Sequence, residues 1–153
     1  MRNQRKLLIE QLDRKIEPFL GTELIYVPEK GWINSIRTTI NMTLEQLGKK
    51  LNMTKQGVKR IEESESAGTI TIKSMKEVGN ALDMKFVYGF VPYDGSVDSL
   101  IDRKSRILAE KIILRTNQNM MLEDQAIEKD KLVVAIDDLT KEIKLELKKA
   151  IWD

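Results

Sequence analysis

The chain has 153 residues, about the size of one average domain; 41% are hydrophobic, 33% are charged and the formal net charge is +2. It contains no Cys, which excludes disulfides and thiolate metal sites, and no His, which removes the commonest general base, so no enzyme, cofactor or metal site is expected. No apolar run approaches the roughly 20 residues that span a bilayer, and the amino terminus resembles an amphipathic helix rather than a signal peptide, which indicates a cytoplasmic protein without membrane contact.

The first predicted elements are a helix and a short strand. Residues 3–19 carry apolar side chains at helical spacing, which predicts an amphipathic helix that Pro18 ends or kinks. The run "TELIYVP" (22–28) is rich in β-prone residues and is closed by Pro28. We therefore expect one helix followed by one strand within residues 1–28.

A second helix is predicted to start near Glu29 and to run through "KGWINSIRTTINM". Its apolar side chains are expected to be buried: Trp32, Ile33, Ile36 and Ile40. Further along, Thr71 opens "IKSMKEVGNAL", whose apolar face predicts another helix. The run "KFVYGFV" (85–91) then alternates in the manner of a strand. We expect it to pair with "ELIYV" as a short β-ribbon; the competing use is the edge of a dimer.

The two segments between these helices carry the clearest start signals. Thr43 precedes "LEQLGKKL" and Gln46 follows three residues later, which is the pattern of a capping box. Thr54 precedes "KQGVKRIEE" and is expected to cap it. Only "NM" (52–53) separates the two segments, so their connection must be a tight helix–helix turn. Such a pair is typical of a helix-turn-helix.

Residues 93–153 are predicted to form a helical extension. Gly95 and Ser96 mark the start of one helix, "TNQNM" (116–120) is a weak point, and a last helix is expected from about Glu128 to Ile151. Residues 103–115 carry five Lys or Arg against one Glu, whereas residues 123–138 carry six acids against two Lys. The basic stretch could contact DNA phosphates, but pairing with the acidic stretch, within the chain or across a dimer, is slightly favoured.

A helix that enters the major groove of DNA must bury one side and present the other. In residues 54–63, Val58 and Ile61 are predicted to face inward, which leaves donor-rich side chains outward: Lys55, Gln56, Lys59 and Arg60. Gln can bond bidentately to adenine, and Arg or Lys to guanine, each good pair discriminating by roughly 1–3 kcal/mol. The helix N-termini at Thr43 and Thr54 offer backbone amides to phosphate oxygens.

Taken alone, this segment is better interpreted as a charged surface helix, in which Lys55 and Lys59 face Glu62 and Glu63. Its setting changes that interpretation. A cap, a small residue at Gly48 that permits a close helix crossing, a short turn and a second cap precede it. Together these features favour a helix that reads DNA.

The sequence resembles the Xre-type (Cro and phage-repressor) helix-turn-helix over roughly residues 32–84, in "MTLEQLGKKLNMTKQGVKRIEESE" and the following "TITIKSMKEVGNALDMKFVY". The pattern consists of Leu47, Gly48, Leu51, Thr54, Val58, Ile61, Glu62 and Leu82. The resemblance implies that Lys55, Gln56 and Arg60 contact bases and that Lys59 contacts a base or a phosphate. Two positions depart from the family. Leu44 stands where a phosphate-contacting Gln is frequent, and Gly57 stands where Ala or a small hydroxyl residue is frequent.

Most of the chain also resembles the proteins called mobile mystery protein A, which are Xre-type proteins of mobile elements encoded beside a Fic-domain partner. The resemblance lies in "LLIEQLDRKIEPF", in "PEKGWINSIRTTINMTLEQLGKKL" and in the run ending in "FVP". The resemblance implies that the chain acts as an antitoxin or as the cognate regulator of a two-gene module. Small antitoxins that inhibit Fic enzymes commonly carry a helix with Ser or Thr, three residues, then Glu followed by Gly or Asn. No Glu here is followed by Gly or Asn, so direct inhibition would need another surface.

The sequence thus predicts a mainly α protein with a lambda-repressor-like (Xre-type) domain at 29–92, an N-terminal helix and strand at 1–28, and a C-terminal extension for dimerisation or partner binding at 93–153. The predicted DNA-binding residues are Thr43, Thr54, Lys55, Gln56, Lys59 and Arg60. The predicted function is repression by a homodimer on a palindrome in double-stranded DNA, as the antitoxin-like autorepressor of a module with a Fic-domain toxin. The alternative is a protein-interaction module that inhibits the toxin directly, with DNA binding secondary.

Overall fold

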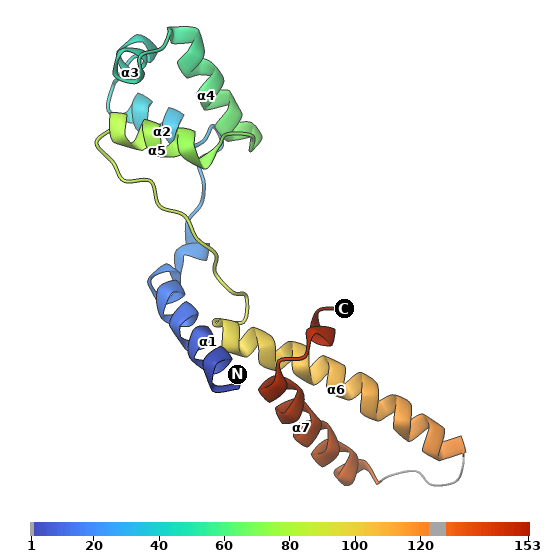
Figure 1. Ribbon diagram of the computed structural model, residues 1–153. Helices are drawn as coiled ribbons and strands as arrows, with labels where there is room; N and C mark the ends of the chain where they lie inside the picture. Colours follow the sequence, from blue (N-terminus) through green and yellow to red (C-terminus); the bar gives the residue numbers. More distant parts are fainter. Residues whose placement is uncertain (1, 123–127) are drawn as a thin grey trace. The chain divides into compact units, whose positions relative to one another are not determined.

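Figure 1 shows the computed structural model of the chain, which describes residues 2–122 and 128–153. Over these residues the protein is mainly helical, with seven α-helices and three short 3-10 segments. The chain divides into two compact units, one formed by Glu23–Tyr88 and the other by Met1–Thr22 together with Gly89–Asp153. Of the described helices, none combines the length and the apolar character that spanning a membrane requires.

Residues 23–88, all of which the structure describes, contain four α-helices (Figure 1): α2 (Trp32–Thr39), α3 (Leu44–Leu51), α4 (Lys55–Ala67) and α5 (Ile72–Ala81). The buried side chains form one aliphatic core: Ile33, Leu47, Val58, Val78 and Leu82. Each of the four helices contributes at least one of them. This shared core fixes how the four helices lie relative to one another.

Threonine side chains start three of these helices. Thr43 Oγ1 accepts the amide hydrogen of Gln46 at 3.0 Å, and Gln46 Oε1 accepts that of Thr43 at 2.9 Å, which confirms the predicted capping box. Thr54 and Thr71 cap α4 and α5, each accepting from the amide three residues later at 3.1 Å. Caps of this kind stabilise a helix by about 1 kcal/mol each. The predicted starts of α3, α4 and α5 are therefore correct.

Three of the helices also end in a shared way. After α2, α3 and α5 the chain turns through a residue with a left-handed backbone, at φ 59°, 55° and 56°: Asn41, Asn52 and Asp83. The amide of the following methionine then donates to the carbonyl five residues earlier, at 2.9, 2.9 and 2.8 Å. Asn and Asp tolerate this conformation better than other non-glycine residues. The tripeptides "INM", "LNM" and "LDM" are thus a repeated helix-ending signal.

The turn between α3 and α4 is tight enough to exclude a side chain at Gly48. A Cβ atom there would lie 2.7 Å from the backbone oxygen of Met53 and 3.4 Å from a methyl carbon of Val58. The Met53 amide donates to the Gly48 carbonyl at 2.9 Å, which holds the turn in place. The predicted need for a small residue is confirmed. The closer of the two contacts is with the backbone of the turn, so the turn restricts the size of residue 48 more than the crossing of the helices does.

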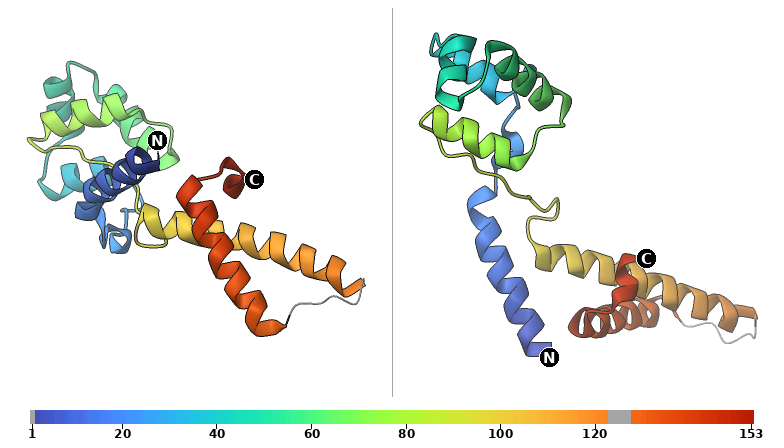
Figure 2. Two further views of the ribbon diagram at one scale, coloured as in Figure 1. Left: turned by 60° about the horizontal axis from the view of Figure 1, so that its bottom comes forward. Right: turned by 45° about the horizontal axis from the view of Figure 1, so that its top comes forward.

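The second unit contains α1 (Arg2–Ile16), α6 (Val97–Leu122) and α7 (Lys129–Glu146). It also contains two 3-10 segments, Glu17–Phe19 and Lys149–Trp152. The third 3-10 segment, Thr22–Leu24, lies at the boundary between the two units. Figure 2 shows α6 and α7 lying side by side and running in opposite directions. The buried core of this unit consists of Ile101 and Ala109 of α6, Ile143 of α7 and Ile151 of the last 3-10 segment. α1 is attached through Asp13, whose carboxylate accepts the amide hydrogens of Val97 and Asp98 at 2.7 and 3.2 Å and so caps α6.

The predicted β-ribbon is wrong. Residues 25–27 and 85–91 lie outside any helix or strand, and the described part of the chain has no strand at all. A strand needs a second run that supplies its ladder and a buried face that fixes its register. Leu24, Ile25, Tyr26 and Val27 are all exposed, so this run has no buried face. The alternation in the sequence does not by itself supply a partner.

Three smaller predictions also fail. Trp32, the first residue of α2, and Ile40, just after its end, are 39% and 50% exposed rather than buried. α6 continues through residues 116–120 to Leu122, where a weak point was predicted; the Thr116 hydroxyl donates to the Ile112 carbonyl at 3.0 Å within the helix. The last helix ends at Glu146 instead of Ile151, because Leu147 adopts a left-handed backbone at φ 48°.

Candidate nucleic-acid interface

The outer face of α4 carries the side chains that the sequence assigns to DNA. Four of them are exposed: Lys55, Gln56, Lys59 and Arg60. Val58, in the same turns of the helix, is fully buried, and Ile61 is half-buried against the same core. This burial pattern confirms the predicted orientation of the helix. Three cations and one amide therefore face solvent along its first two turns.

These outward side chains are not engaged by the protein. In the part of the chain that the structure describes, none of the four makes a hydrogen bond or an ion pair through its side chain. The surface-helix interpretation required Lys55 and Lys59 to face Glu62 and Glu63. Glu62 is instead only 7% exposed and is bonded to α2. The positive charge at the start of α4 is therefore left largely uncompensated.

The N-termini of α3 and α4 differ in how well they suit a phosphate group. The first turn of α4 contains no acidic residue and begins with Lys55, whereas that of α3 contains Glu45. At both ends the threonine oxygen accepts an amide hydrogen, so the hydroxyl hydrogens of Thr43 and Thr54 can be donated outward. Backbone amides and the positive end of the helix dipole both favour an anion. The start of α4 is the better phosphate site of the two.

A buried ion pair holds α4 against α2. Arg37 Nε donates to Glu62 Oε1 at 2.5 Å, and its Nη2 donates to Oε2 at 3.3 Å. Asn34 Nδ2 donates to the same Oε2 at 3.0 Å, and Arg37 Nη1 donates to the Met42 carbonyl at 2.9 Å. The guanidinium thus joins α2, the segment before α3 and the middle of α4. The outward face of α4 is presented from a helix fixed at its centre.

A second carboxylate of α4 caps α2. Glu65 accepts the amide hydrogens of Trp32 and Ile33 at 2.7 and 2.8 Å. Gly31, just before α2, has φ 88°, and a Cβ atom there would lie 2.7 Å from the Glu65 carboxylate. The positive φ favours glycine at this position, and a side chain there would displace the Glu65 carboxylate from its capping contact. α2 and α4 are linked at two points, through Glu62 and Glu65.

Sequence reasoning missed both contacts, although a signal for the first one was present. Arg37 lies four residues after Ile33, and Glu62 lies four residues after Val58, so both occupy the predicted buried faces of their helices. Opposite charges on two buried faces indicate that the two helices meet there, because a buried charge is stable only when paired.

Of the two departures from the Xre pattern, the structure explains the one at Leu44. Leu44, where the family often has Gln, packs against the core of the unit and is not available to phosphate. Gly57 has room for a side chain: a Cβ atom would meet Met53 and Thr54 at 3.4 Å, which is ordinary contact. The glycine at 57 is therefore not required by the packing of the protein itself.

Comparison with models of known protein families, with curated proteins and with solved structures found no match to this chain. The functional interpretation therefore depends on the residues and their geometry.

The basic stretch 103–115 is partly neutralised within the chain. Arg106 Nη2 donates to Asp137 at 2.6 Å, and Arg103 Nε donates to Asp94 at 2.8 Å. In each case the hydrogen bond first, and the carboxylate charge second, raise the pKa of the guanidinium. The predicted pairing with the acidic stretch is confirmed for Arg106; residues 123–127 of that stretch lie outside the described residues.

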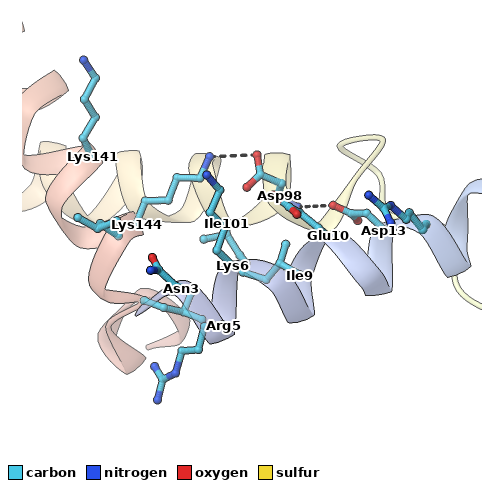
Figure 3. A pocket seen from close by; sticks show the side chains of 13 residues that line it. Asn3, Arg5, Lys6, Ile9, Glu10, Asp13, Asp98, Ile101, Lys141 and Lys144 are labelled. Carbon is cyan, nitrogen blue, oxygen red and sulfur yellow. Dashed lines mark hydrogen bonds and ion pairs between the residues drawn. The ribbon is translucent and has the colours of Figure 1, made fainter. Parts of the chain in front are cut away.

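A groove in the other unit is a second candidate surface (Figure 3). It has a volume of about 640 Å³ and lies between α1, the start of α6 and the end of α7, over an apolar floor: Ile9, Ile101, Leu145 and Leu147. Two of the carboxylates that line the groove already bind other groups of the chain. Asp13 caps α6, and Asp98 pairs with Lys144 at 3.1 Å.

Cations dominate the rest of the groove. Arg5, Lys6, Arg14 and Lys141 line it, and in the described part of the chain their side chains form no hydrogen bond or ion pair. Glu10 is the remaining acid of the lining, so an apolar floor with a mainly positive rim is suited to a partner segment that has apolar and acidic side chains.

Proposed function

We propose that the chain is a sequence-specific DNA-binding regulator of the Xre helix-turn-helix type, in which α4 reads the major groove. The observation that carries the proposal is the outward face of α4. It presents three cations and a glutamine, none of them engaged by another side chain of the described protein, on a helix held at its centre by the Arg37–Glu62 pair.

In this proposal the parts of α4 have distinct roles. The amides of its first turn and the Thr54 hydroxyl bind a backbone phosphate and set the register. Gln56 bonds to adenine, and Lys55, Lys59 and Arg60 bond to guanine or to phosphate. One such helix reads only a few base pairs, so two copies on a palindrome supply the remaining specificity. The genes that it regulates are those of its own operon.

The test is binding of the full chain to its own upstream DNA, measured by fluorescence anisotropy. Replacing Lys55, Gln56 and Arg60 together by Ala should abolish specific binding while the circular dichroism spectrum is unchanged. Lys129→Ala with Lys131→Ala, which removes two exposed positive charges from α7, is the matched control and should keep operator binding. Unchanged operator affinity in the triple variant would refute the assignment of α4.

The resemblance to mobile mystery protein A extends the proposal to an antitoxin-like autorepressor with a Fic-domain toxin as partner. The second candidate function is direct inhibition of that toxin, and the groove of the other unit favours it. Co-purification with the product of the adjacent gene tests this function. Charge reversal at Lys6 and Lys141 should abolish co-purification and leave DNA binding intact; co-purification that survives the reversal assigns the partner to another surface.

A further inference from the structure

The groove between α1, α6 and α7 offers an occupant side chains and no strand edge. Its lining residues belong to these three helices, apart from Leu147, which directly follows α7. Backbone groups inside a helix are paired within it. An extended peptide that lay in the groove would therefore leave its own amides and carbonyls without partners over the apolar floor. A helix carries its backbone hydrogen bonds with it, so a helix is the peptide conformation that fits.

The cations of the groove that no other group engages are spread along it. Arg5 and Arg14 lie nine residues apart on α1, which corresponds to about 13 Å along the helix axis. Lys141 belongs to α7, and Figure 3 shows its side chain and that of Arg5 extending in opposite directions. An ion pair requires a separation of no more than about 4 Å. One phosphate or carboxylate group therefore cannot meet these cations, whereas several carboxylates along one molecule can.

The volume of the groove fits one face of such a helix. A helix of about nine residues covers the distance between Arg5 and Arg14, and at a diameter of about 10 Å it occupies about 1,000 Å³. The groove has a volume of about 640 Å³. It therefore admits the apolar side of the helix and leaves the opposite side in solvent. The acidic side chains that meet the cations would lie along the two borders of the apolar side.

We propose that the groove is the docking site for an acidic amphipathic helix of a partner protein. For the identity of that partner, the toxin, the proposal rests on the second candidate function. Charge complementarity selects the occupant, because in the described part of the chain the groove has four unengaged cations against one such acid, Glu10. A helix seated in the groove would contact both α1 and α7.

Binding of a peptide to the full chain tests the proposal. The peptide is labelled with fluorescein, has about 15 residues, which is long enough to populate a helix, and carries Leu along one face with Glu on both borders. Fluorescence anisotropy should show saturable binding, and a second peptide with Lys in place of every Glu should not bind. No saturable binding of the acidic peptide, or equal binding of the two peptides, would overturn the proposal.

Charge reversal locates the binding. Lys6→Glu with Lys141→Glu should weaken binding of the acidic peptide by at least about tenfold, because like charges then face each other. Lys129→Glu with Lys131→Glu makes the same change in net charge on α7 outside the groove, and should bind as the wild type does. All four lysines are exposed, so the circular dichroism spectrum should not change. Equal weakening in the two double variants would show that only net charge matters and would overturn the proposal.

A thiol label shows whether the groove is open and where the peptide lies. Because the chain has no Cys, Leu145→Cys introduces a single reactive group in the groove, and Ile107→Cys introduces one on α6 outside it; the native side chains are 58% and 50% exposed. Leu145→Cys should react with maleimide in the free chain and be protected by saturating peptide, whereas Ile107→Cys should react in both cases. Protection of Leu145→Cys without peptide would show that the chain covers its own groove, and reactivity that persists with peptide bound would place the peptide elsewhere. Either result would overturn the proposal.

These measurements use neither DNA nor the product of the adjacent gene, so the docking site and the proposed function can fail separately. If the peptide binds in the groove and the gene product does not co-purify, the toxin is the wrong partner and the docking site stands. If the gene product co-purifies and the peptide does not bind, the partner uses another surface and the docking site is wrong.

Discussion

Arg37 of α2 and Glu62 of α4 form a buried ion pair in which the carboxylate accepts hydrogen bonds from both Arg37 and Asn34. The side chains are 11% and 9% exposed. Charges removed from water in this way are stable only while both partners are present. The pair therefore makes the position of α4 depend on α2, a helix that contributes none of the predicted DNA-binding residues.

Glu62→Ala should lower the free energy of unfolding by about 3–5 kcal/mol, because it leaves the Arg37 charge buried without its partner. Urea denaturation followed by circular dichroism measures the loss. Glu63→Ala, at the exposed neighbouring position, is the control and should change stability by less than about 0.5 kcal/mol. Equal effects at the two positions would show that the pair does not hold α4.

Gly57→Ala should stabilise the protein by about 0.4–1 kcal/mol. The substitution removes a flexible residue from α4, and the new methyl group makes only ordinary contacts with Met53 and Thr54. Thermal denaturation should show a melting temperature higher by a few degrees. A lower melting temperature would mean that the turn before α4 cannot accommodate the methyl group.

Gly48→Ala should have the opposite effect and cost about 1–3 kcal/mol, because its Cβ atom would lie 2.7 Å from the backbone oxygen of Met53. The two glycines are nine positions apart and chemically identical, so the contrast isolates the space around each. Lys49→Ala is the control, since its side chain is exposed. Stability of Gly48→Ala equal to wild type would contradict the tight turn described above.

Asp13→Asn should weaken the start of α6, because the charged carboxylate caps the amides of Val97 and Asp98. Loss of such a cap costs about 0.5–2 kcal/mol, and an amide oxygen recovers part of it. Hydrogen exchange should show faster exchange at these amides, with α4 unaffected. Glu10→Gln, in the same helix and groove, should leave them protected; faster exchange there as well would point to a general loosening of α1.

Local signals explain which parts of the fold could be predicted. Thr43, Thr54 and Thr71 start helices through bonds that reach only three residues along the chain, so the sequence contains the whole interaction. The helix ends at Asn41, Asn52 and Asp83 are equally local and could have been recognised. The prediction of the β-ribbon failed because the partner of each run is distant. The β-ribbon required two runs some sixty residues apart to pair, and alternation in each run carries no information about the other.

The same distinction applies to the candidate site. Which side chains of α4 face outward follows from its helical period, and the burial of Val58 bears this out. What fixes α4 could not be predicted in the same way, because the groups that Glu62 and Glu65 bind are distant in sequence. Their partners lie on α2, and identifying them requires knowing that α2 and α4 meet.

The most direct test of base reading by α4 is a scan of single base-pair changes in the operator against the wild type and Arg60→Ala, measured as dissociation constants at fixed salt. The prediction is that Arg60→Ala loses discrimination at one symmetrical position in each half-site, by about 1–3 kcal/mol, and keeps it at the others. If Arg60→Ala instead weakens binding equally at every position, and the same holds for Gln56→Ala, then α4 contacts only the phosphate backbone and the central claim is contradicted.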